Sequence, residues 1–69
     1  MSSFEPREGS PVIGDIGFCE ELNDTVELVD RIKTEFGYND NIFWIAKDSS
    51  DRLVIVNERN LTDIGFYGE

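Results

Sequence analysis

The fold is decided by the stretch Ile42-Phe43-Trp44-Ile45-Ala46-Lys47, together with Asp48-Ser49-Ser50-Asp51 and Arg52-Leu53-Val54-Ile55-Val56-Asn57. The first and last runs are rich in β-branched and aromatic residues, and the link between them consists of turn-forming residues. We therefore predict a β-hairpin over residues 42–57 with a short polar loop. Because successive side chains alternate across a strand, both faces of this hairpin are apolar, and each face needs a cover.

One helix is predicted over Leu22–Phe36, because apolar residues recur there at helical spacing. Asp24, followed three residues later by Glu27, resembles a capping box, and acidic residues suit the positive end of the helix dipole. Gly37 then occupies the position at which many helices end in a left-handed residue. The apolar stripe that would face the sheet consists of Leu22, Val26, Val29, Ile32 and Phe36.

The remaining segments are expected to form an arm and two short strands. The composition of residues 1–10 predicts a flexible or extended arm, and residues 11–69 are expected to form a single small domain. Residues 11–18 are interpreted as a short edge strand because Pro and Gly interrupt them, and residues 61–67 as a short terminal strand or turn. The predicted fold class is therefore α+β, with one helix packed on a small antiparallel sheet in the order β-α-β-β. Phe4 is interpreted as an exposed residue, with an anchor for the arm as the alternative.

A tetrapeptide, Asp-Ile-Gly-Phe, occurs twice, at residues 15–18 and 63–66. One repeated tetrapeptide does not indicate a repeat architecture, and chance is the favoured explanation. The alternative is that both segments make the same bend and flank the hairpin, each placing an Ile and a Phe in the core.

The charge of the chain favours a protein partner over nucleic acid or membrane. Fifteen acidic residues stand against six basic ones, which gives a formal net charge of −9. Such a surface repels phosphates and anionic lipids, whereas proteins that bind nucleic acid directly are usually basic. We therefore expect a protein partner with a basic surface, no direct nucleic-acid binding and no membrane binding.

The residue types needed for common catalytic sites are missing from the sequence. The chain has no histidine, which argues against His-based catalysis and the usual zinc sites, and its one cysteine cannot form an internal disulfide. Cys19 should be a poor nucleophile, because the neighbouring acidic residues disfavour its thiolate form. We interpret it as a small buried apolar residue. We expect no enzyme activity, no cofactor and no metal.

The carboxylates of residues 48–51 are attributed to turn chemistry rather than to a calcium site. With no long apolar run and no signal peptide, a cytoplasmic protein is expected.

An acidic run, without a single basic residue between Glu20 and Asp30, suggests where a partner would bind. A solvated helix face explains this run about as well. Carboxylates along a helix can also imitate the charge density of a nucleic-acid duplex, as small phage and plasmid inhibitors of nucleic-acid enzymes do by analogy of composition. Trp44 belongs to a residue type common at interfaces, although the core is its commoner place. The predicted partner-binding residues are Glu20, Glu21, Asp24, Glu27, Asp30 and Trp44.

Two functional classes therefore follow from the sequence. The first is a small acidic protein that inhibits or modulates a nucleic-acid-handling protein by binding its basic surface. The alternative is a structural, assembly or adaptor module that binds a protein through apolar contacts or a free strand edge. A monomer is expected, with a homodimer as the alternative.

Overall fold

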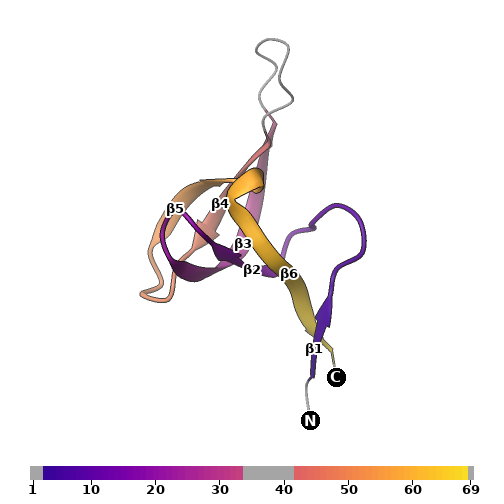
Figure 1. Ribbon diagram of the computed structural model, residues 1–69. Helices are drawn as coiled ribbons and strands as arrows, with labels where there is room; N and C mark the ends of the chain where they lie inside the picture. Colours follow the sequence, from indigo (N-terminus) through magenta and orange to yellow (C-terminus); the bar gives the residue numbers. More distant parts are fainter. Residues whose placement is uncertain (1–2, 34–41, 69) are drawn as a thin grey trace.

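The computed structural model describes residues 3–33 and 42–68, and these form one antiparallel sheet with a single short 3₁₀ turn (Figure 1). The strands follow the order β1-β6-β2-β3-β4-β5 across the sheet. The predicted α+β fold is wrong, because no α-helix occurs among the described residues. The elements are β1 (Ser3–Pro6), β2 (Ile16–Cys19), β3 (Asp24–Lys33), β4 (Ile42–Lys47), β5 (Leu53–Asn57), the 3₁₀ turn η1 (Glu58–Asn60) and β6 (Leu61–Gly68).

The predicted hairpin is confirmed. Strands β4 and β5 pair antiparallel, with Ile45 opposite Ile55, and residues 48–51 lie in the connecting loop. Asp51 adopts a left-handed conformation with φ of 64°, as the last turn position requires. The carboxylate of Asp48 accepts hydrogen bonds from the backbone N–H groups of Ser50 and Arg52, so turn chemistry accounts for this acid.

The predicted helix over Leu22–Phe36 is wrong, since Asp24–Lys33 form the long strand β3. Val26 is buried in the core whereas Val29 is exposed, so the supposed stripe does not lie on one face. The register of β3 against β4 shifts just after Leu28, so Val29 is an extra residue that interrupts the alternation of faces along the strand. The β-branched residues of this segment favour a strand on their own account. The last three residues of the predicted helix, and the turn predicted after it, lie outside the described part of the chain.

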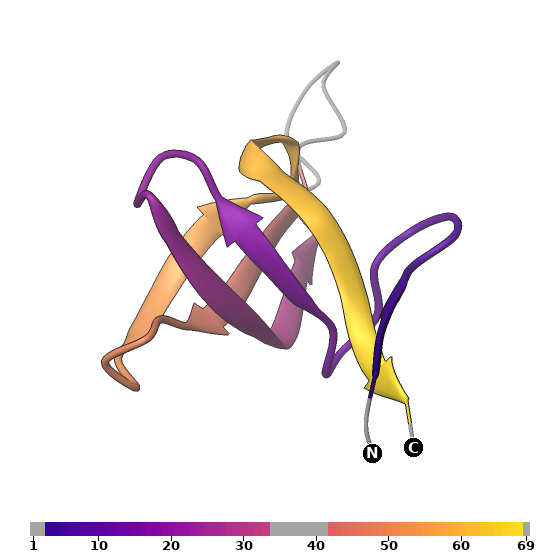
Figure 2. The same cartoon turned by 60° about the horizontal axis from the view of Figure 1, so that its bottom comes forward.

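The sheet must curl because of the short connection between β5 and β6. Strand β5 ends at Asn57 and β6 begins at Leu61, although three other strands separate β5 from β6 in the sheet. A chain of that length spans at most about 14 Å, whereas four strand spacings in a flat sheet measure about 19 Å. Figure 2 shows the resulting curled sheet, with β6 returning alongside β2. Register shifts in the β2–β6 and β3–β4 pairs supply the additional twist.

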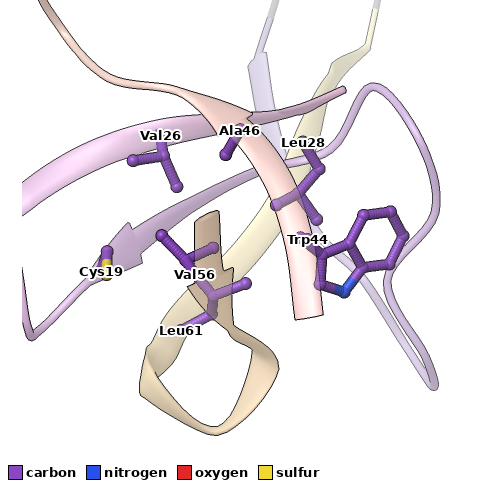
Figure 3. Close-up of a cluster of buried hydrophobic side chains, with 7 residues drawn as sticks. All are labelled: Cys19, Val26, Leu28, Trp44, Ala46, Val56 and Leu61. Carbon is purple, nitrogen blue, oxygen red and sulfur yellow. The ribbon is translucent and has the colours of Figure 1, made fainter. Parts of the chain in front are cut away.

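The core lies on the inner side of the curl, where side chains from five strands meet (Figure 3). Trp44 is its largest member, at 1% exposure, and its indole Nε1 donates a hydrogen bond to Glu58 Oε1 at 3.1 Å. Cys19 is fully buried, which confirms its interpretation as a small apolar residue. The buried apolar residues are Cys19, Val26, Leu28, Trp44, Ala46, Val56 and Leu61.

The N-terminal segment is tied to the sheet. Strand β1 pairs with β6, and the ring of Phe4 meets that of Tyr67 edge to face at 5.5 Å between ring centroids, as the anchor interpretation requires. Arg7 donates from Nε and Nη2 to the two carboxylate oxygens of buried Asp15, both at 2.9 Å, and stacks over the ring of Phe66. These hydrogen bonds hold the pKa of Asp15 below its ordinary value.

The repeated tetrapeptides lie next to each other rather than flanking the hairpin. Strand β2 is central in the sheet, between β6 and β3, so the edge position predicted for residues 11–18 is wrong, whereas the terminal strand predicted at residues 61–67 is confirmed. Ile16 lies opposite Gly65 in the β2–β6 pair. Asp15 is buried while Asp63 is exposed with φ of 51°, so the two copies do not make the same bend.

Candidate functional site: the outer groove

The outer face of the sheet, opposite the core, has two hollows that adjoin at Ile16 and Thr25. Alternation along the strands places these two side chains outward, since their neighbours Gly17 and Val26 are buried. Each hollow has a volume of about 330 Å³. We call the two together the outer groove.

The first hollow of the outer groove is aromatic. It lies where β6 and β2 pair, with β1 beside them. Gly65 lets β1 lie close to β6 beside this hollow, because a methyl group there would run into the carbonyl oxygen of Glu5 and the ring of Phe4. Phe4 and Tyr67 both line the hollow, and their rings contact each other edge to face. The hollow is lined by Phe4, Ile16, Gly17, Phe18, Thr25, Asp63 and Tyr67.

The second hollow is acidic. It lies between β3 and the loop of the β4–β5 hairpin, and Glu27 projects outward there opposite both Ile16 and Lys47. Lys47 Nζ lies 3.7 Å from Asp51 Oδ1, a spacing that leaves both groups largely solvated. Three of its residues are acidic and one is basic. The lining residues are Ile16, Thr25, Val26, Glu27, Lys47, Asp48 and Asp51.

Two carboxylates of the outer groove are available to a ligand. Glu27 and Asp63 make no hydrogen bond or ion pair with any other side chain that the structure describes, and both are exposed. One lies in each hollow. A face with aromatic rings and unpaired carboxylates suits a cation, since rings attract cations through their π faces and carboxylates accept two hydrogen bonds from a guanidinium.

Only one of the predicted partner-binding residues, Glu27, lies in the outer groove. Glu20 and Glu21 lie in the turn between β2 and β3, where the Glu21 carboxylate accepts a hydrogen bond from the Asn60 side chain. Asp30 lies in the irregular part of β3, and its carboxylate accepts a hydrogen bond from the N–H of Arg31. These acids therefore lie in the β2–β3 turn and along β3 rather than on one helix face.

Asp24 and Trp44 have structural partners instead. The Asp24 carboxylate accepts hydrogen bonds from the hydroxyl of Ser49 at 2.7 Å and from its N–H at 3.1 Å, and these bonds hold the pKa of Asp24 below its ordinary value. Asp24 therefore fixes the hairpin loop to β3 and does not cap a helix. Trp44 lies in the core at 1% exposure, so its ring is not on the surface of this fold.

The aromatic hollow was not identified from the sequence as a site. Its rings come from residues at both ends of the chain and from β2, and only the pairing of β1 with β6 brings Phe4 to Tyr67. The available signal was weak. Gly65 stands in the second copy of the repeated tetrapeptide, between the apolar residues Ile64 and Phe66, and a strand glycine often marks a close approach.

Neither a cluster of metal-ligand residues nor a membrane-spanning helix is found among the described residues. Within ranges 3–33 and 42–68, no three His, Cys, Asp or Glu side chains are grouped as metal ligands would be. None of the described segments forms a helix that is long and apolar enough to cross a membrane. Comparison with known proteins finds no matching family, no significantly similar curated protein and no significantly similar solved structure.

Proposed function

We propose that this protein is a non-enzymatic binding module whose outer groove takes a basic, arginine-containing segment of a partner protein. The observation that carries this proposal is the junction of an aromatic hollow with an acidic one at Ile16 and Thr25. An arginine can stack on a ring while its guanidinium meets a carboxylate, which lysine does less well. Glu27 and Asp63 are the carboxylates proposed for this contact.

The overall charge supports the same proposal at longer range. A net charge of −9 attracts a basic protein surface and raises the rate of encounter. Proteins that handle nucleic acid present such basic surfaces, so we propose a partner of that class, with inhibition or modulation as the consequence of occupying its surface. We also place the protein in the cytoplasm of the cell that makes it.

Imitation of a nucleic-acid duplex is no longer part of this proposal. Such imitation needs carboxylates spaced along a helix, whereas Asp24, Glu27 and Asp30 lie on strand β3 and Glu20 and Glu21 lie in the turn before it. Glu27 and Asp30 are three residues apart on an extended chain, or about 10 Å, whereas a duplex has one charge per roughly 1.7 Å of its axis. The proposed contact therefore depends on the outer groove and not on carboxylates spaced like the phosphates of a duplex.

Two matched double variants test the role of the groove. Glu27→Gln with Asp63→Asn removes both available carboxylates, and asparagine tolerates the left-handed backbone of Asp63. Glu8→Gln with Glu20→Gln removes two exposed carboxylates elsewhere, so both proteins have a net charge of −7. The assay is capture of partners from an extract of the native host, identified by mass spectrometry and followed by titration with the purified partner.

We expect the groove variant to lose at least tenfold in affinity for the partner and the control variant to lose less than threefold. Affinity should also fall between about 50 and 500 mM salt, because exposed charges are screened within about 8 Å at physiological ionic strength. Equal losses of affinity in the two variants would show that the interaction depends on net charge alone. Unchanged affinity in both would place the contact elsewhere on the molecule.

A second candidate function is an assembly module that binds through its apolar surface. One observation favours it: Ile45, Leu53 and Ile55 form an apolar patch on the outer face at β5, the last strand of the described sheet, and the last two are 65% and 67% exposed. Association through this patch would persist at high salt and would survive the loss of Glu27 and Asp63. The same two variants therefore separate the two functions.

A further inference from the structure

Within residues 3–33 and 42–68, strand β5 is an edge of the sheet, paired only with β4. The N–H of Asp48 donates to the carbonyl of Arg52 at 3.0 Å, so these two residues form a hydrogen-bonded pair at the end of the β4–β5 ladder. Bonded and non-bonded pairs alternate along an antiparallel ladder, which makes Ala46 and Val54 the next bonded pair. The N–H and C=O groups of Leu53 and Ile55 therefore point away from β4, to the side where no described residue pairs.

The edge at β5 lacks the features that usually prevent pairing. Residues 53–57 include no proline and no charged residue, and they form regular pairs with β4 throughout. The opposite edge differs, because β1 contains Glu5 and Pro6, and a proline has no N–H to donate. The side chains of Leu53 and Ile55 are also largely exposed on the outer face. Pairing is therefore favoured at β5 and not at β1.

Repulsion between like charges is the main obstacle to association of two copies, and this repulsion is weakest at the edge formed by β5. The described range 42–60 contains three basic and three acidic residues and is electrically neutral. The described range 3–33 contains eight acidic and three basic residues, with a net charge of −5. Two copies that meet at β5 would therefore bring their neutral halves together and keep their acidic halves apart.

We propose that two copies of this chain pair through β5 about a two-fold axis at Ile55. In that register Ile55 lies opposite Ile55 of the second copy, and all residues of the strand are paired. Unlike charges then also face each other beyond the strand ends, with Arg52 opposite Glu58 of the second copy and Asp51 opposite its Arg59. The interface is isologous, as in most closed homodimers.

The dimer would be weak, and it does not depend on the proposed function. A strand of this length measures about 17 Å, so the interface lies at the small end of the range for specific complexes. A two-fold axis perpendicular to the sheet keeps both outer faces on the same side. Should the outer groove bind as proposed, the dimer would present two grooves to one partner and gain affinity through the effective concentration of the second site.

Sedimentation equilibrium with charge variants tests the association. The mass of the unmodified protein should rise with protein concentration, and rise further at high salt because repulsion is screened. Ile55→Lys places two ammonium groups across the axis and should leave a monomer at all concentrations. Ile13→Lys adds the same charge at a residue that is 62% exposed outside the sheet, and should associate as the unmodified protein does. Equal weakening by both variants overturns the proposal, as does a monomer mass at high salt and high concentration.

Disulfide trapping tests the register. Directly opposed residues of a bonded pair have Cα atoms about 5.5 Å apart, which lies within the range that a disulfide spans. Under mild oxidation, Ile55→Cys should form a covalent dimer at least tenfold faster than Leu53→Cys or Ile13→Cys, while the buried Cys19 stays unmodified. Equal rates for Ile55→Cys and Ile13→Cys overturn the interface, and a faster reaction of Leu53→Cys overturns the register.

Discussion

Replacing Gly65 by alanine should release β1 and dismantle the aromatic hollow. The added methyl group would overlap the carbonyl oxygen of Glu5 and the tip of the Phe4 ring. Because the carbonyl belongs to the backbone, no side-chain rotation relieves this contact, and β1 must move away from β6. Gly68→Ala is the matched control on the same strand, since a methyl there would make only ordinary contact with the side chain of Glu5, at 3.4 Å.

The expected free energies favour release of β1 over strain throughout the domain. Overpacking of a well-ordered site costs about 1–3 kcal/mol. Releasing the four residues of β1 forfeits ladder hydrogen bonds worth about 1 kcal/mol each, but each freed residue regains roughly 1–2 kcal/mol of backbone entropy. The regained entropy, about 4–8 kcal/mol, offsets the loss of about 4 kcal/mol of hydrogen bonds, so detachment is the cheaper response. Gly68→Ala should be neutral or stabilising by about 0.4–1 kcal/mol, because alanine has fewer unfolded conformations.

Hydrogen exchange measures this release directly. The Arg7 N–H donates to the Ile64 carbonyl at 2.9 Å and reports on the attachment of the arm, whereas the Leu28 N–H, bonded to the Asp15 carbonyl at 2.8 Å, reports on the centre of the sheet. In Gly65→Ala, the Arg7 amide should lose most of its protection while Leu28 keeps its own. An Arg7 amide as well protected as in the unmodified protein would refute the close approach of β1 to Gly65.

Two further predictions concern buried polar groups. Asp15→Asn should destabilise the protein at neutral pH by about 1–3 kcal/mol, because a charged hydrogen-bonded carboxylate is lost. Since Arg7 lowers the folded-state pKa of Asp15, the stabilisation is present above the unfolded-state pKa and disappears as the pH falls through the folded-state value. Thermal melting from about pH 7 to pH 2 should therefore show a smaller acid loss in Asp15→Asn than in the unmodified protein, and parallel curves would contradict this account. Glu58→Ala leaves the buried indole N–H of Trp44 unsatisfied, with an expected loss of about 1–3 kcal/mol in urea unfolding. Glu58→Gln keeps an acceptor and should lose less than half as much, and equal losses would show that this hydrogen bond does not stabilise the fold.

Local sequence was sufficient for the hairpin and insufficient for the segment before it. Residues 42–57 combine strand-forming residues with a turn whose left-handed position is filled by Asp51, and every local preference agrees. In β3, Val26 and Val29 are spaced as on one face of a helix, but the strand buries Val26 and exposes Val29 as the extra residue of the register shift. Leu28 is one of the most buried residues but was not part of the predicted apolar stripe. It shares a face with Val26 in a strand, where faces alternate with a period of two, but not in a helix.

The candidate site could not be found from local sequence because long-range pairing creates it. Phe4 and Tyr67 stand near opposite ends of the chain and meet only because β1 pairs with β6. The acidic run did indicate Glu27 correctly as exposed, but Glu20 and Glu21 lie in the turn between β2 and β3. The carboxylates of Asp24 and Asp30 accept hydrogen bonds from backbone N–H groups. The basic partner inferred from net charge stays a prediction, whereas strand pairing determines which carboxylates share a groove with aromatic rings.

A backbone NMR titration with a basic peptide tests the outer groove most directly. The probe is a peptide of about eight residues that alternates arginine with glycine, and the control replaces each arginine by lysine. We predict that the arginine peptide shifts the amide signals of Ile16, Thr25 and Glu27 saturably, that the lysine peptide binds at least threefold more weakly, and that salt weakens both. Shifts spread over exposed acids outside the groove, such as Glu8 and Glu20, with equal affinity for both peptides, would contradict a groove that recognises arginine.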